Sequence, residues 1–198
     1  NAVISVEDKN FYNHIGFDYL RIIQAFINNI KNKKIVEGAS TISQQYIKNA
    51  YLEFDQTWSR KIKEALMTLN LEVHYTKDEI LEAYLNTINY GQGNYGISSA
   101  AKYYFNKKPS ELSLEESLIL AGIPKSPNNY NPIKSYDNAI KRAKIVGLTM
   151  LNNKKISKYA KAYHKGINLV DNASAHLNKT IILKQKMLWQ EKLFSRAW

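Results

Sequence analysis

Apolar residues recur along most of the chain with the period of an α-helix. In the segment 17–30, one face carries Phe17, Leu20, Ile23, Ile27 and Ile30, as expected of a helix that packs one side against a core. The segments 40–51 and 58–74 also read as helices, and the apolar positions of the second are Ile62, Ala65, Leu66, Leu69 and Val73. The pattern predicts amphipathic helices that pack together.

Polar residues indicate where several helices begin and end. Thr76 with Glu79, and Ser113 with Glu116, have the spacing of a capping box, in which the hydroxyl and the carboxylate bond to each other's backbone. A loop rich in proline and asparagine at 124–132 stops the helical pattern, and helices are predicted again over 137–151 and from about 154 to 165. No alternating pattern lasts more than a few residues, so the predicted fold class is mainly α.

The tail, residues 166–198, allows two interpretations. Its segment 180–194 could form a basic amphipathic helix, with Ile182, Leu183, Met187, Leu188 and Phe194 on the apolar side, that packs on the domain or lies on a membrane. The alternative is that this tail specifies no defined structure.

Composition and charge narrow the class of protein. The chain has 198 residues, of which 44% are hydrophobic and 23% charged, as in a soluble globular domain. Its net charge of +11 favours anionic partners such as phosphate esters, nucleic acid or an anionic membrane. Cysteine is absent, which excludes disulfides and thiolate metal sites. No apolar run reaches the roughly 18 residues of a membrane span. Because the first residue is Asn1 and not methionine, we expect a fragment, in which a signal or anchor upstream would not be visible.

Three patterns are better explained by structure than by chemistry. The segment Gly91–Gly96 fits G-x-G-x-x-G, but it follows a helical pattern instead of a strand, so we expect a tight loop and no dinucleotide site. The four histidines have no close ligand spacing, which argues against a metal held by protein side chains alone. Tyrosines interleaved with lysines at 101–109 match no nucleic-acid-binding module, so we expect no nucleic-acid partner.

Four polar clusters lie within the first 86 residues. They are Glu7–Asp8 with Phe11 and His14, the segment 37–49, the segment 60–64 and the segment 80–86. Each has a structural explanation when taken alone: Arg60 and Glu64, four residues apart on a helix, would form only a weak surface ion pair. Ser40 and Thr41 stand at a predicted helix N-terminus, which offers backbone N–H groups to an anion.

Taken together and in order, these clusters resemble the peptidoglycan glycosyltransferase domain (glycosyltransferase family 51) of class A penicillin-binding proteins and monofunctional transglycosylases. The matching stretches are "EDKNFYNHIG", "GASTISQQYIKN", "RKIKE", "ILEAYLNTINYG" and "AAKYYF", and the resemblance covers residues 1–165. It implies a mainly α, lysozyme-like domain at the outer face of the bacterial cytoplasmic membrane, anchored by an N-terminal segment absent from this chain. The implied substrates are lipid II and the growing glycan strand, the implied inhibitor is moenomycin, and other cell-wall synthesis proteins are conceivable partners.

The resemblance also implies a role for each matching residue. Glu7 corresponds to the general base that takes a proton from the acceptor sugar, and Glu64 to a second essential glutamate near the donor pyrophosphate. Lys48, Arg60 and Lys61 would stabilise the charge of that pyrophosphate, with Mg or Mn as a conceivable ion near Glu64. The remaining expected substrate-binding residues are Asp8, Phe11, His14, Ser40, Thr41, Gln44, Gln45 and Asn49. Glu82, Tyr84 and Asn86 belong to a motif that is mostly architectural in the family.

The sequence favours a domain at 1–165, a tail at 166–198 and no transpeptidase domain. The tail contains no S-x-x-K, S-x-N or K-T-G; Ser99–Lys102 and Ser126–Asn128 fit the first two by chance, inside transferase-like segments. The sequence allows two other functions. A lysozyme-like hydrolase or lytic transglycosylase would cleave glycan strands, but it has no pyrophosphate to hold and so no need of the 40–45 and 60–64 segments. A non-enzymatic binder of acidic surfaces would not depend on Glu7.

Overall fold

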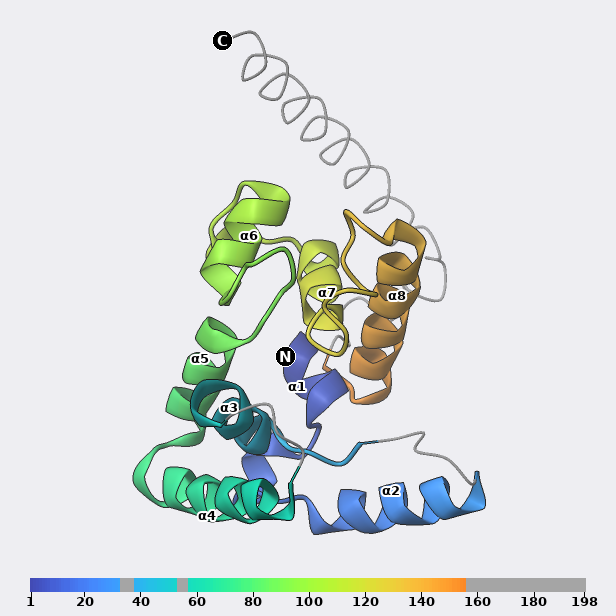
Figure 1. Cartoon of the computed structure of the whole chain (residues 1–198). Helices are drawn as coiled ribbons and strands as arrows, with labels where there is room; N and C mark the ends of the chain where they lie inside the picture. The colour runs from blue at the N-terminus through green and yellow to red at the C-terminus, as the bar shows by residue number, and fades with distance from the viewer. Residues whose placement is uncertain (33–37, 53–56, 156–198) are drawn as a thin grey trace, which may run out of the picture. The chain divides into compact units, whose positions relative to one another are not determined.

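The computed structural model describes residues 1–32, 38–52 and 57–155, and within these ranges it is helical (Figure 1). The helices are α1 (Ala2–Glu7), η1 (Phe11–Asn13), α2 (Tyr19–Lys31), α3 (Ile42–Tyr51), α4 (Trp58–His74), α5 (Lys77–Thr87), α6 (Ile97–Phe105), η2 (Pro109–Glu111), α7 (Leu114–Gly122) and α8 (Tyr136–Asn152). The described residues contain no strand, only an isolated bridge between Asn89 and Tyr95. The prediction of a mainly α fold is therefore confirmed for this part of the chain.

The predicted helices agree with the observed ones to within two residues where both are described. The segment 17–30 becomes α2, 40–51 becomes α3, 58–74 becomes α4 and 137–151 becomes α8. Both predicted capping boxes are present, at Thr76 of α5 and Ser113 of α7. The helix expected up to residue 165 and the whole tail 166–198 lie outside the described residues.

The chain forms two compact units, one of which comprises Val3–Ile88. Within this unit α3 packs against both α4 and α5, and the three helices lie together in Figure 1. Fully buried side chains hold them, among them Phe11, Ile42, Ile80 and Tyr84. Because α3 lies between α4 and α5, residues on its different faces meet different helices.

Of the described residues, the second unit combines Asn1–Ala2 with those from Asn89 onward. Here α7 packs on α8 and α6 packs on α7. The Gly91–Gly96 segment is a tight loop, as predicted: Gly91 has a φ of +81°, and a Cβ atom there would lie 2.8 Å from the carbonyl oxygen of Pro127. Glycine is required at this position by both its backbone angle and the close approach of the neighbouring chain.

The expected packing of two apolar helix faces is wrong. On α2, Leu20 is 74% exposed, and Ile23, Ile27 and Ile30 are also exposed. On α4, Val73 is 79% exposed, with Trp58, Ile62, Leu66 and Leu69 also exposed. The helical period was predicted from the apolar spacing, but that spacing carries no information on whether another element covers the face. None of the described helices is both long and apolar enough to cross a membrane.

Candidate active site

Asp8 joins the end of α1 to the start of α3. Its side chain is fully buried, and both carboxylate oxygens lie 3.0 Å from Nε2 of His14. One of them also accepts the backbone N–H of Ile42, the first residue of α3, at 3.0 Å. Each contact adds a donor to a carboxylate that would otherwise be buried at high cost. Asp8 therefore fixes the position of Glu7, its neighbour, relative to α3.

The N-terminus of α3 is held by Thr41. The Thr41 hydroxyl accepts the backbone N–H of Gln44 at 3.2 Å and donates to the carbonyl oxygen of Gly16 at 2.6 Å. In return, the side-chain carbonyl oxygen of Gln44 accepts the backbone N–H of Thr41 at 3.2 Å, which completes a capping box. A third capping box, unrecognised in the sequence, thus orders the helix that carries both glutamines.

Two adjacent glutamines of α3 each donate a hydrogen bond to a different carboxylate, that of Glu64 or that of Glu7. The side-chain amide N–H of Gln44 donates to Oε1 of Glu64 at 3.1 Å, whereas that of Gln45 donates to Oε2 of Glu7 at 3.3 Å. Neighbouring residues of an α-helix point about 100° apart, so the pair can serve two partners on different sides of the helix. The carbonyl oxygen of Gln45 accepts the hydroxyl of Tyr84 at 3.0 Å.

Glu64 is a buried carboxylate surrounded by donors and cations. It is 1% exposed, and its Oε1 also accepts the ammonium of Lys61. Its Oε2 lies 3.5 Å from Nη1 of Arg60 in an ion pair. Both cations remain partly exposed, Lys61 more than Arg60. Since two positive charges meet one negative charge, the cluster keeps an excess positive charge toward solvent, which suits an anion.

The residues around Glu64 do not fit a metal ion held by the protein alone. The described residues contain no group of three or more acidic, histidine or cysteine side chains that could hold a metal. The oxygens of Glu64 face an amide N–H, an ammonium and a guanidinium, which are not metal ligands. An Mg or Mn ion at this place would depend on oxygens from the substrate, and no chemical step is derived through it.

The sequence-predicted residues occupy three kinds of position. One network joins Glu7, Asp8, His14, Thr41, Gln44, Gln45 and Glu64, with Arg60 and Lys61 at its margin. Lys48 and Asn49 are exposed on α3, outside that network. Ser40 is exposed just before α3, and its backbone carbonyl oxygen accepts the side-chain amide of Gln45 at 3.5 Å. Phe11 is fully buried, with its ring 5.2 Å from that of Tyr12 and beneath the ammonium of Lys77, so it offers no surface to a ligand.

A second polar cluster behind α3 was not recognised in the sequence. The buried hydroxyl of Ser43 donates to Oε1 of Glu72, and the ammonium of Lys77 lies 2.6 Å from Oε2 of the same carboxylate. Ser43 lies within a quoted motif, but Glu72 and Lys77 carry no local signal, because their pairing depends on how α4 turns into α5. The cluster ties α3, α4 and α5 together beneath the site.

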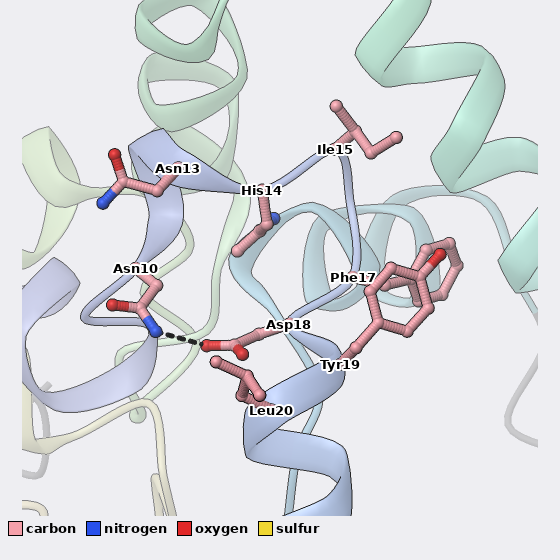
Figure 2. A pocket seen from close by; sticks show the side chains of 8 residues that line it. All are labelled: Asn10, Asn13, His14, Ile15, Phe17, Asp18, Tyr19 and Leu20. Atoms are coloured by element: carbon pink, nitrogen blue, oxygen red, sulfur yellow. Dashed lines mark hydrogen bonds between the residues drawn. The ribbon is translucent and has the colours of Figure 1, made fainter.

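A cavity of about 470 Å³ lies beside His14, in the loop that leads into α2 (Figure 2). It is lined by Asn10, Asn13, His14, Ile15, Phe17, Asp18, Tyr19 and Leu20. Asp18 begins α2 by accepting the backbone N–H of Arg21 at 3.0 Å, and it accepts the amide of Asn10 at 2.8 Å. Burial acts to raise the pKa of Asp18, but these two hydrogen bonds, together with the charges of His14 and Arg21, outweigh it and leave the pKa below its usual range.

Comparison with known proteins gives this geometry a family context. The family model described as Transglycosylase matches residues 1–151. Penicillin-binding protein 2D of Bacillus subtilis (strain 168) is 49% identical over 156 residues, which are 79% of this chain and 23% of that protein. Penicillin-binding protein 1A of Aquifex aeolicus (strain VF5) is 42% identical over 171 residues, covering 85% of this chain and 24% of that protein.

A solved structure is also similar in sequence. The crystal structure of penicillin-binding protein 1A from Haemophilus influenzae is 32% identical, with a TM-score of 0.40, and the match covers 59% of this chain and 14% of that one. The chain spans about a quarter of the length of the curated relatives named above. On the match of the family model and the identity to these relatives, the chain belongs to the transglycosylase family.

Proposed function

We propose that this domain is a peptidoglycan glycosyltransferase that polymerises lipid II into β-1,4-linked glycan strands and releases undecaprenyl pyrophosphate. The observation that carries the proposal is the pair of glutamates served by adjacent glutamines of α3, in a chain of the transglycosylase family. One carboxylate lies next to a neutral amide and the other among cations. The surroundings of Glu7 suit a group that accepts a proton, and those of Glu64 suit the binding of an anion.

Glu7 is the proposed general base. As the 4-hydroxyl oxygen of the acceptor sugar attacks C1 of the donor sugar, Glu7 takes the hydroxyl proton, and the bond from C1 to the pyrophosphate oxygen breaks with inversion. The electron pair leaves with the pyrophosphate, which needs charge stabilisation more than protonation. Oε2 of Glu7 accepts the neutral side-chain amide of Gln45.

The cations near Glu64 are proposed to bind the donor pyrophosphate. Glu64 holds Arg60 and Lys61 in place by ion pairs, and both keep exposed surface through which to contact an anion. Lys48 is exposed on the same helix as Gln44, which donates to Glu64. Ser40 and Asn49, also exposed, are proposed to line the donor site, whereas the buried Thr41 and Gln44 shape it from behind.

Asp8, Phe11 and His14 are proposed to position the base instead of contacting substrate. Asp8 and Phe11 have no exposed surface, and the side chain of His14 is 8% exposed. The network through Asp8 connects the end of α1 to the start of α3. Their loss would move Glu7 relative to the donor cations.

The proposed place of action is the outer surface of the bacterial cytoplasmic membrane. The exposed apolar faces of α2 and α4 and the net charge of +11 both suit an anionic lipid surface. Lipid II carries its pyrophosphate at such a surface, so the donor cations would meet it there. Other proteins of cell-wall synthesis would be met at the same surface.

The test is polymerisation of labelled lipid II in detergent by this chain and by Glu7→Gln, with and without moenomycin. The proposal expects glycan chains from the wild type, a loss of at least roughly a hundredfold in Glu7→Gln, and inhibition by the antibiotic. Release of sugars from a finished glycan strand, without polymerisation, would indicate a hydrolase instead. Lipid II binding without any turnover in either protein would indicate a binding module.

A further inference from the structure

The orientation of the Gln45 side chain is determined by what it contacts. An ionised carboxylate only accepts hydrogen bonds, so the amide group of Gln45 must present N–H to Glu7. Its carbonyl oxygen then faces the Tyr84 hydroxyl, 3.0 Å away, and this hydroxyl must donate. The chain of donors runs in one direction, from Tyr84 through Gln45 to Glu7.

Tyr84 is well placed to enforce this direction. It belongs to α5, which packs directly on α3, and its side chain has no exposed surface. A buried phenol on a packed helix has little freedom to rotate its oxygen away from Gln45. The neighbouring Gln44 is oriented in the same manner, except that its carbonyl oxygen accepts the backbone N–H of Thr41.

We propose that Tyr84 is a positioning residue for Glu7 and acts through Gln45. The inference rests on the proposed role of Glu7 as the general base. Without the hydroxyl, the Gln45 carbonyl oxygen loses its donor, and the side chain of Gln45 is no longer held at that end. The amide N–H can then shift, and the carboxylate of Glu7 that it contacts loses its fixed position. The family motif that contains Tyr84 would thus serve the reaction as well as the architecture.

The experiment compares Tyr84→Phe with the matched control Tyr90→Phe. Tyr90 is also fully buried, and its hydroxyl has no hydrogen-bond partner among the described residues, so its loss tests only the removal of a buried oxygen. For each protein, kcat and KM for lipid II are measured, together with the melting temperature. The side-chain amide resonances of Gln45 are followed by NMR in parallel.

For Tyr84→Phe the inference expects kcat to fall roughly tenfold with KM unchanged, because the base is misplaced and donor binding is not. It expects the Gln45 amide resonances to move in this variant and to stay in place in Tyr90→Phe. Unchanged kcat in Tyr84→Phe overturns the inference, as does an equal fall in both variants. If the wild type forms no polymer, the proposed function fails, and the Gln45 resonances alone decide: resonances that stay in place overturn the positioning role.

Discussion

Asp8 shows how much a single buried carboxylate holds in this domain. It accepts from His14 and from the first backbone N–H of α3, and replacing it by alanine leaves both donors without an acceptor. We expect Asp8→Ala to lower the free energy of unfolding by about 2–4 kcal/mol. Asp137→Ala, which removes an exposed carboxylate from α8, should change it by less than about 0.5 kcal/mol. Urea unfolding of both variants checks this, and similar midpoints would contradict it.

Asp18 should make stability depend on pH in a defined direction. Burial acts to raise its pKa, but the N–H of Arg21, the amide of Asn10 and the charges of His14 and Arg21 together lower it below its unfolded value of about 3.9. A depressed folded-state pKa contributes stability above the unfolded pKa and loses it as the pH falls through the folded pKa. The advantage of wild type over Asp18→Asn, measured by thermal melting, should therefore be constant above about pH 5 and shrink below about pH 4. An advantage independent of pH would rule out this contribution.

Among the helices, α3 depends most on its cap. Thr41→Ala removes a hydroxyl that accepts from Gln44 and donates to Gly16, so we expect a loss of about 1–2 kcal/mol in unfolding free energy. Thr76→Ala removes the exposed cap of α5 and should cost about 0.5–1 kcal/mol. Only Thr41→Ala should reduce polymerisation by more than its effect on stability, because α3 carries Gln44 and Gln45, which contact Glu64 and Glu7. Equal activity of the two variants at a temperature where both are folded would contradict this.

The loop before α2 depends on a glycine for two separable reasons. Gly16 has a φ of +87°, and a Cβ atom would lie 2.9 Å from Cγ2 of Thr68. Gly93 has a φ of +73° but open space around it. Gly93→Ala should therefore cost only backbone strain of about 1–2 kcal/mol. Gly16→Ala should cost clearly more, because Thr68 and the loop must also move. Chemical unfolding of the two variants measures the difference, and equal losses would show that the contact is relieved freely.

How much of each helix and its contacts could be predicted depends on how far apart the two partners lie along the chain. The boxes at Thr76 and Ser113 were predicted because both partners lie within four residues. The contact of Asp8 with Ile42 spans 34 residues, and that of Tyr84 with Gln45 spans 39. No local rule relates such residues. The family resemblance selected Asp8 and Gln45, but only the packing of α3 shows which partner each contacts.

Across the residues that the structure describes, the apolar pattern predicted where helices occur and not what each face meets. Helices read from their apolar residues include both α3, whose Ile42 and Ile47 are buried, and α2, whose Ile23 and Ile27 are exposed. Burial depends on the neighbours that the chain supplies, and these are set by tertiary structure. The exposed faces are therefore where the molecule as a whole has apolar surface available for a partner.

If that partner is the membrane, the apolar face of α2 should contribute to lipid binding together with the positive charge. We expect the chain to bind phosphatidylglycerol vesicles better than phosphatidylcholine vesicles, and less at high salt. Replacing two exposed isoleucines, in the double variant Ile23→Gln with Ile27→Gln, should weaken binding to anionic vesicles by roughly ten- to a hundredfold, since each apolar side chain entering lipid contributes about 1 kcal/mol or more.

Gln24→Ala changes an exposed polar position of the same helix and provides the matched control. Circular dichroism would establish that the double variant remains helical, and vesicle sedimentation would give the affinities. Full binding by the double variant, with the salt dependence unchanged, would mean that lysines and arginines hold the domain at the surface without insertion of α2. Weaker binding by the double variant alone would place α2 at the lipid boundary, on the same unit of the chain that carries Glu7 and Glu64.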